Sequence, residues 1–424
     1  MKYGCNGCGY LSAQWLGFCP RCRDESGLVA LDDGGSAVDA VSVLDVEPER
    51  ARHQPTGVAE FDRVLGGGLV PGAAVLVAGE PGVGKSTLLL QVAASAAAAG
   101  RAVLFASGEE SPPQIGARAL RVGAAEAMLH VMPGSSVATV IAAAADLKPS
   151  LIVIDSIQTI HASTADAVAG TTASVRMAAA ELVAWAKANG IPLVLVGHVN
   201  KEGAIAGPKV LEHAVDVVAH LEGDHHRDLR VLRCRKNRYG PTSRIGLFRL
   251  MEAGMVEVAD ASKALVGSWQ GDVAGSVAFP AFEGGRAVVV EIQALVTPTS
   301  AANQRRSVRG IDSARLHQVV AVLERHAGMD FRGHDIYVGV SGGLRVKDPG
   351  ADLPVALALA SSLAGVPLGR IGAWGEVGLT GEVRSVAHDD RRREEAERIG
   401  LSGFITPAPG SARIRAVVGA AGVT

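Results

Sequence analysis

One short stretch, from Gly79 to Thr87, constrains the fold of this 424-residue chain more than any other segment. It reads GEPGVGKST, follows the apolar run Ala74–Ala78 and precedes the helical run Leu88–Ala99. A strand, a glycine-rich loop and a helix in this order wrap nucleotide phosphates in backbone N–H groups at a helix N-terminus. We therefore expect an ATP site with Lys85 on the β- and γ-phosphates and Ser86 on Mg²⁺. The expected nucleotide-binding residues are Gly79, Glu80, Pro81, Gly82, Val83, Gly84, Lys85, Ser86 and Thr87.

Three further apolar runs are expected to be strands whose tips lie beside this loop. The run Leu151–Asp155 ends in an acid that would bind Mg²⁺ through water. The run Ala102–Ser107 is followed by Glu109, which would polarise the attacking water or, alternatively, lie in a solvated acidic loop. The run Pro192–Gly197 is followed by His198, either a sensor of the γ-phosphate or a structural histidine.

Strands and helices alternate over residues 51–260, which predicts a mostly parallel sheet with helices on both faces. Near the end of this domain, residues 225–249 hold eight Lys or Arg and a single acid. Lys236 and Arg238 would enter a neighbouring subunit's ATP site and stabilise the transferring phosphoryl group, an effect of about 10³–10⁵ in rate. A solvated basic hairpin is the alternative.

Four of the five cysteines lie near the N-terminus, at Cys5, Cys8, Cys19 and Cys22. The doubled Cys-x-x-Cys spacing predicts a closed four-thiolate zinc site in residues 1–31, and the metal would supply the folding energy that so short a segment lacks. A redox pair or unrelated thiols are the alternatives. Residues 32–50 read as a linker, and the buried-strand pattern around Cys234 makes it a plain apolar residue.

Sparse cysteines fit a reducing cytoplasm, and no apolar run of about 18 residues predicts a membrane span. The N-terminus lacks the apolar region of a secretory signal. The net charge of −2 excludes a uniformly basic nucleic-acid coat, so any positive charge that meets DNA must be gathered locally.

These motifs resemble the RadA (Sms) family of bacterial DNA repair proteins over nearly the whole chain. The resemblance rests on the cysteine motif, Gly79–Thr87, Ser107–Ser111, Gly197–Gly203 and Lys236–Gly240. Tyr239 stands where the family usually has Phe, and Asn200 where it often has Thr; both changes are mild. The resemblance implies a RecA-type ATPase core in a hexameric ring on single-stranded and branched DNA. It also implies a branch-migration motor that acts with the RecA recombinase in the bacterial cytoplasm, at the nucleoid.

The last expected domain, residues 261–424, contains the segments Ser341–Gly343, Asp348–Leu353 and Gly375–Glu382. On these segments the chain from about residue 265 onward resembles the Lon-type protease domain, an α/β fold, but it lacks that domain's Ser–Lys dyad. Ala351 stands where the serine is expected and Arg392 where the lysine is expected. Alanine offers no nucleophile, and a guanidinium does not deprotonate to act as a base. Peptidase activity is therefore not expected, which argues against an ATP-dependent protease.

A basic segment, expected to be a loop, lies between an expected strand, Ala287–Val296, and an expected helix, Ser313–His326. Residues 303–325 hold five Arg and two acids. Such a segment would contact DNA phosphates without reading bases, and binding would weaken with salt; a solvated charge run is the alternative. The expected DNA contacts are Arg305, Arg306, Arg309, Arg315 and Lys201.

Two functions stay open at this point. The first is an ATP-driven DNA motor in homologous recombination, and the second is an ATP-switched mediator or clamp that binds DNA without translocation. Glu109 together with Lys236 and Arg238 favours turnover.

Overall fold

The structure is a computed structural model that describes residues 2–5, 11–12, 16–23, 29–31, 52–162, 171–198, 210–223, 228–301, 303–401, 403–407 and 412–423. The chain divides into two compact units, Met1–Ala51 and Arg52–Thr424. Several residues of interest lie outside the described ones: the expected linker 32–50, Cys8, Asn200 and Lys201.

The first unit contains a small antiparallel sheet in the order β2-β1-β3. Its strands are β1 (Lys2–Gly4), β2 (Leu11–Ser12) and β3 (Val29–Leu31). Cys5 follows β1 directly, and Cys19 and Cys22 flank a turn in which the N–H of Arg23 donates to the carbonyl oxygen of Cys19 at 2.8 Å. The short strands and this turn bring the ends of the cysteine motif together.

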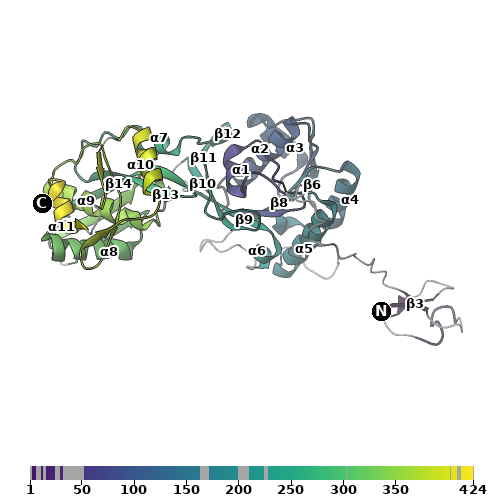
Figure 1. Ribbon diagram of the computed structural model, residues 1–424. Coiled ribbons are helices and arrows are strands. Elements are labelled where there is room, and N and C mark those ends of the chain that lie inside the picture. Colours follow the sequence, from purple (N-terminus) through teal and green to yellow (C-terminus); the bar gives the residue numbers. More distant parts are fainter. Residues whose placement is uncertain are drawn as a thin grey trace, which may run out of the picture. The chain divides into compact units, whose positions relative to one another are not determined.

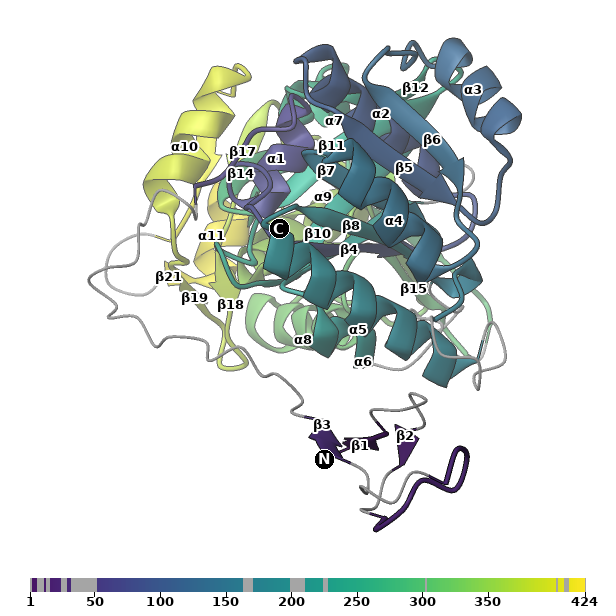
Figure 2. The ribbon, with the colours of Figure 1, turned by 90° about the vertical axis from the view of Figure 1, so that its right-hand side faces the viewer.

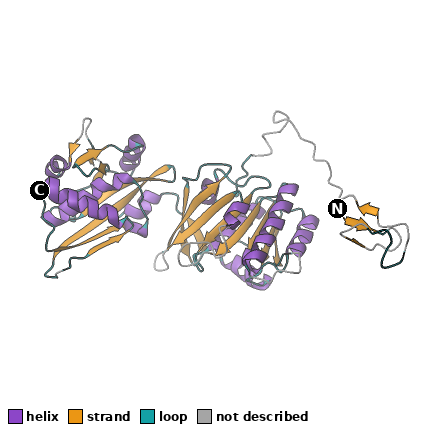
Figure 3. Ribbon diagram, turned by 90° about the horizontal axis from the view of Figure 1, so that it is seen from below, coloured by secondary structure: helices purple, strands orange, loops and turns teal. Residues whose placement is uncertain are grey.

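The second unit begins with a nine-stranded sheet (Figures 1 and 3). Six adjacent strands are parallel, in the order β9 (Val217–Gly223), β4 (Ala74–Gly79), β8 (Leu193–His198), β7 (Leu151–Asp155), β5 (Val103–Ser107) and β6 (Leu129–Pro133). Beyond β9 the sheet continues antiparallel through β10 (Leu229–Asn237), β11 (Ile245–Met251) and β12 (Gly254–Glu257). This confirms the expected mostly parallel α/β core.

Helices cover both faces of this sheet because both faces of its strands are apolar. Val75 and Val77 of β4 face one helical layer, and Leu76 and Ala78 face the other. The first layer contains α1 (Ala59–Leu65), α2 (Lys85–Ala98) and α3 (Pro112–Arg121). The second contains α4 (Val137–Leu147) and α5 (Thr172–Asn189), which lie side by side over the sheet in Figure 2, with α6 (Val210–Ala214) beside α5. Strands that are apolar on both faces are typical of parallel sheets between helices.

The C-terminal part is built on a six-stranded sheet. Its order is β15 (Arg306–Arg309), β16 (His334–Val340), β14 (Arg286–Pro298), β13 (Ser276–Glu283), β17 (Ile371–Ala373) and β20 (Gly403–Ile405). A second, three-stranded sheet contains β18 (Glu376–Val377), β19 (Glu382–Arg384) and β21 (Ala412–Arg413). The helices are α7 (Ala261–Val266), α8 (Ser313–Val322), α9 (Asp352–Ala364), α10 (Asp389–Arg398) and α11 (Ile414–Ala420).

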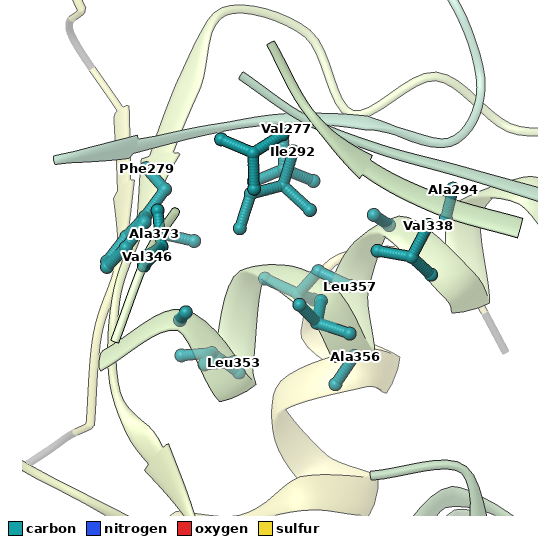
Figure 4. Packing of buried hydrophobic residues seen from close by; sticks show 14 of the residues in the cluster. Val277, Phe279, Ile292, Ala294, Val338, Val346, Leu353, Ala356, Leu357 and Ala373 are labelled. Atoms are coloured by element: carbon teal, nitrogen blue, oxygen red, sulfur yellow. The ribbon is translucent and has the colours of Figure 1, made fainter. Parts of the chain in front are cut away.

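The core of this part lies between the sheet and α9. Val277 of β13 and Ile292 of β14 point toward Leu353 and Leu357 of α9, and all four side chains are buried (Figure 4). Because α9 is apolar on nearly every side, it is enclosed by its neighbours rather than lying on the surface.

Two local features differ from the expectations. The basic segment expected as a loop contains β15, which pairs in parallel with β16 at the edge of the sheet. The expected helix Ser313–His326 is regular only to Val322 and continues as a wider turn, Leu323–Ala327, to Gly328, whose φ is +77°. Among the described residues, no helix is long and apolar enough to cross a membrane.

Candidate nucleotide site

Four parallel strands end together beside the glycine-rich loop. In the sheet register, Gly79 at the end of β4 is opposite His198 at the end of β8, and Ser107 of β5 is opposite Asp155 of β7. The loop after β4 leads directly into α2, which begins at Lys85. The strand ends that carry Glu109, Asp155 and His198 therefore lie beside the loop, because the carboxyl ends of adjacent parallel strands share one edge.

Two glycines of the loop are required by its backbone. A Cβ at Gly79 would lie 2.5 Å from the carbonyl oxygen of Leu221, closer than atoms can approach. Gly84 caps α2 with a φ of +107°, in the left-handed region that favours glycine. A larger residue at either position would change the shape of the loop that is expected to wrap phosphates.

The Lys85 ammonium bridges the loop and the next strand. Its Nζ donates to the carbonyl oxygens of Gly79 and Glu80, both at 2.9 Å, and lies 3.3 Å from Nδ1 of His198. Burial lowers the pKa of Lys85, although the charges of Asp155 and Glu109 oppose that effect. A buried ammonium held mainly by two neutral carbonyls is well placed to exchange them for an anionic phosphate.

The Glu109 carboxylate continues this line of contacts. Its Oε1 lies 2.9 Å from Nε2 of His198 and accepts a hydrogen bond from the hydroxyl of Ser156 at 2.6 Å. The hydrogen bond to His198 is the main reason that the pKa of Glu109 falls to about 2. Glu109 is therefore ionised and fixed in position, as a residue that orients a water molecule must be.

The Asp155 carboxylate lies in the same group. Burial raises its pKa, and a hydrogen bond from the Ser86 hydroxyl works in the opposite direction. Its Oδ1 is buried and has no hydrogen-bond partner among the residues that the structure describes. A hydroxyl and a carboxylate with a free buried oxygen are oxygen ligands of the kind that Mg²⁺ takes, so these residues fit the expected metal.

Sequence reasoning missed two residues here. Ser156 follows the expected metal-binding acid directly and could have been considered on that ground. Arg230 at the start of β10 carried no signal; its buried Nε donates to the carbonyl oxygen of Val83 in the glycine-rich loop at 3.0 Å. It supports the loop from a strand far along the chain.

Lys236 and Arg238 lie at the other edge of the sheet from the glycine-rich loop. Arg238 Nη1 donates to Asp216 Oδ1 at 3.1 Å, and the other oxygen of Asp216 accepts the N–H of Ala74 at the start of β4. The six residues of β4 separate the two edges by about 17 Å. The pair is therefore not part of the phosphate-binding edge of its own chain.

Three of the four predicted zinc ligands come together. The sulfur atoms of Cys5, Cys19 and Cys22 all lie within 4.8 Å of one another, and those of Cys5 and Cys22 are 3.5 Å apart. Thiolates are ligands that zinc prefers, so these residues fit a zinc ion. Cys8, the expected fourth ligand, lies outside the described residues, whereas Cys234 is buried in β10 as expected.

The predicted DNA-contacting arginines have different surroundings. The side chains of Arg305 and Arg309 are exposed and make no hydrogen bond or ion pair within the described part of the chain, whereas Arg306 donates to the carbonyl oxygen of His334. Arg315 instead makes a two-pronged ion pair with the buried Asp352, at 2.8 and 2.7 Å. Its guanidinium links α8 to α9 through this ion pair. Arg315 is therefore less free to contact DNA phosphates than the number of basic residues in this segment suggests.

Comparisons with known proteins find similarity in the part of the chain that contains this site. A family model described as an AAA domain matches residues 41–204, so the chain contains an ATPase domain of this kind. A solved DnaB-like replicative helicase, reported with its interactions with primase, aligns with a TM-score of 0.44 at 16% identity and covers 49% of this chain and 62% of the other.

Curated relatives match almost from end to end. The DNA repair protein RadA of Bacillus subtilis (strain 168) is 40% identical over 422 residues, which span 96% of this chain and 92% of that protein. The protein of the same name from Mycobacterium tuberculosis (strain ATCC 25618 / H37Rv) is 43% identical, over 96% of this chain and 88% of its own. With such identity over nearly the full length of both partners, the chain belongs to the RadA family of DNA repair proteins.

Proposed function

We propose that this protein is a DNA-dependent ATPase that drives branch migration or single-strand translocation at recombination intermediates. It would work as a homo-oligomer, most simply a hexameric ring, together with the RecA recombinase in the bacterial cytoplasm at the nucleoid. The observation that carries the proposal is the continuous line of contacts from Lys85 through His198 to Glu109. That line joins the residue expected to bind the γ-phosphate to the residue expected to activate water.

The chemistry follows from this line. When ATP binds, Lys85 exchanges the carbonyl oxygens of Gly79 and Glu80 for phosphate oxygens. Glu109, held by His198 and Ser156, orients the water that attacks the γ-phosphorus. Mg²⁺ held by Ser86 and Asp155 would neutralise charge on the phosphates. Because His198 contacts both Lys85 and Glu109, it would respond to the presence of the γ-phosphate and pass that change to residues 199–209.

The position of Lys236 and Arg238 supports catalysis between subunits. One chain presents its phosphate-binding loop at one edge of the sheet and this cationic pair at the opposite edge. Only a second copy can bring such a pair to the phosphates, and contacts of this head-to-tail kind form rings where the rotation between copies closes. Hydrolysis would then depend on assembly.

DNA would be held by its phosphates. Arg309 ends β15 and Arg305 directly precedes that strand; both side chains are exposed, whereas Arg306 and Val308 between them are half-buried. Lys201 would add a contact from the segment after β8. Contacts of this kind hold DNA without reading its sequence, as a moving motor requires.

A three-stranded branch-migration assay tests the proposal. We expect the wild type to move the branch point only while ATP is hydrolysed, and Lys85→Ala to neither hydrolyse nor move it. Lys263→Ala, which removes an exposed ammonium from α7, is the matched control and should behave as wild type. If the wild type hydrolyses ATP on DNA without any strand movement, the motor is wrong and the ATP-switched mediator or clamp takes its place.

A second experiment tests whether hydrolysis takes place between subunits. Arg238→Ala should still bind nucleotide in a single chain but lose hydrolysis by about 10³-fold or more. Normal hydrolysis by this variant would show that the arginine does not act on phosphate.

A further inference from the structure

A single buried carboxylate organises the basic edge of the sheet. Asp216 has a side chain that is only 2% exposed, and it follows α6 directly before β9. Its Oδ2 accepts the N–H of Ala74 at 3.1 Å, while its Oδ1 accepts Lys187 Nζ at 3.0 Å and Arg238 Nη1 at 3.1 Å. The backbone N–H of Arg238 also donates to the Asp216 carbonyl oxygen at 3.1 Å. Main chain and side chain of Arg238 are therefore both tied to this residue.

The cations around Asp216 remain open to solvent on their other side. The Lys187 side chain is 43% exposed and that of Arg238 is 56% exposed. A guanidinium has five N–H donors, and Arg238 gives one of them to Asp216. The remaining N–H donors of the Arg238 guanidinium and of the Lys187 ammonium can bind an oxyanion that approaches from the solvent side.

Lys236 belongs to the same group. Its Nζ donates to the carbonyl oxygens of Glu212 and Val215, both at 2.7 Å, next to Asp216. Burial, followed by the positive charge of Arg238, lowers the pKa of Lys236, and the charge of Lys187 acts in the same direction. The charges of these three cations therefore interact with one another near the buried carboxylate of Asp216.

The composition of the group indicates what it binds. The charges of two carboxylates, Asp216 and Glu212, oppose those of the other cations at Lys236. Three cations still outnumber these two carboxylates, and the excess of positive charge favours an anionic partner. A planar guanidinium grouped with two ammonium groups offers many N–H donors, which suits the several oxygens of a phosphoryl group.

We propose that Lys187 is a third cation of this site, that Asp216 is its positioning residue, and that the anion is the terminal phosphate of a nucleotide held by a second copy of the chain. The inference rests on the proposed function, because it takes hydrolysis between subunits as given. It adds two residues that lie outside the Lys236–Gly240 motif. Asp216 acts by aiming Arg238 and by allowing three cations to lie together, and it touches no phosphate itself.

Mixed assemblies test the inference, because a trans-acting residue can be supplied by another chain. Asp216→Asn should lose hydrolysis by roughly 10²-fold and Lys187→Ala by roughly tenfold, with nucleotide affinity unchanged because the loop of each variant is intact. Lys187→Arg should recover most of the rate, and Arg176→Ala, an exposed cation on the same helix, should match the wild type.

The decisive comparison mixes each variant with Lys85→Ala. In such an assembly, the intact loop of Asp216→Asn meets the intact basic edge of the Lys85→Ala chain, so hydrolysis should return. Mixing Asp216→Asn with Arg238→Ala should not restore it, because both chains lack the same half of the site. Since Lys187 is exposed, the Lys187→Ala arm does not depend on how well the Asp216 variant folds.

Three results would overturn the inference. The first is wild-type hydrolysis by Lys187→Ala. The second is a mixture of Asp216→Asn with Lys85→Ala that stays inactive while Arg238→Ala with Lys85→Ala recovers, which would make Asp216 purely structural. The third is failure of the Arg238→Ala mixture itself, which would instead remove hydrolysis between subunits from the proposed function.

Discussion

Arg392 Nη1 lies 2.7 Å from Asp348 Oδ2, and both side chains are almost entirely buried. Arg392 also donates to the carbonyl oxygens of Pro280 and Ala387 at 2.7 and 3.0 Å. Its guanidinium lies about 6 Å from the ring centre of Phe279 as well. The position that resembles the lysine of a Ser–Lys dyad is thus a structural cross-link, and the neighbouring Ala351 offers no hydroxyl.

Removing Arg392 should therefore damage the fold rather than a reaction. Arg392→Leu leaves Asp348 as a buried charge without its ion-pair partner, a change that costs about 3–5 kcal/mol of unfolding free energy. Urea unfolding measures this. Arg391→Leu, at the exposed adjacent position of α10, is the control and should lose little. Equal stability of the two variants would contradict the cross-link.

The cysteine cluster predicts metal content. Elemental analysis should find one zinc per chain in the wild type and far less in Cys19→Ser, because a structural zinc needs its complete thiolate set. Cys234→Ser should keep the zinc, since that thiol lies in β10. A chelator should unfold the N-terminal unit and leave the unfolding transition of residues 52–424 unchanged. Equal zinc in Cys19→Ser and wild type would rule the site out.

Asp260 predicts a pH dependence of stability. Its carboxylate accepts two hydrogen bonds from Arg398, both at 2.8 Å, and this lowers its pKa from 3.8 to about 2. A lowered pKa stabilises the fold above pH 3.8, and the contribution is lost as the pH falls through about 2. Asp260→Asn keeps the helix cap but removes the charge.

The difference in urea midpoint between wild type and Asp260→Asn should consequently be constant from pH 8 to about pH 5 and shrink below pH 4. Asp272→Asn, at an exposed carboxylate with no ion pair within the described ranges, should show no such trend. A difference that grows on acidification would reverse the assignment.

The exposed side chains of Arg305, just before β15, and Arg309, at its end, predict a salt dependence of DNA binding. Each phosphate contact with a single strand contributes about 0.7 to the slope of log affinity against log salt. Arg305→Ala and Arg309→Ala should each lower the slope by about that amount. Arg332→Ala should not, because this exposed arginine is paired with Asp330 at 2.9 Å. Unchanged slopes in both the Arg305 and the Arg309 variants would show that DNA binds to another surface of the protein.

Local sequence signals predicted the nucleotide edge well. The strand Leu151–Asp155 has the expected bounds, and the expected loop joins β4 to α2, because apolar runs and glycines act within a few residues. Contacts between residues far apart in the sequence could not be predicted in this way. Asp216 meets Lys187 across 29 positions, and Arg230 meets Val83 across 147, so only the folded chain brings them together.

Charge counting has the same limit. Residues 303–325 are basic in sum, but the sum does not reveal that Arg315 is paired with Asp352, a residue 37 positions later. Nor does it show that Arg306–Arg309 forms an edge strand, whose pairing with β16 depends on a partner far along the chain. Composition predicts that cations gather, whereas tertiary pairing decides which of them are free.

The contacts at the two ends of β4 bear on how many complete ATP sites an assembly would contain. The N–H of Ala74 binds Asp216 in the cationic group, and Gly79 begins the glycine-rich loop at the opposite end of the same strand. On the proposal above, an open row of n chains completes n − 1 sites and leaves one loop and one cationic edge idle at its ends. Adding the closing contact completes the last site without adding a chain. Turnover per chain would therefore report whether the assembly is open or closed.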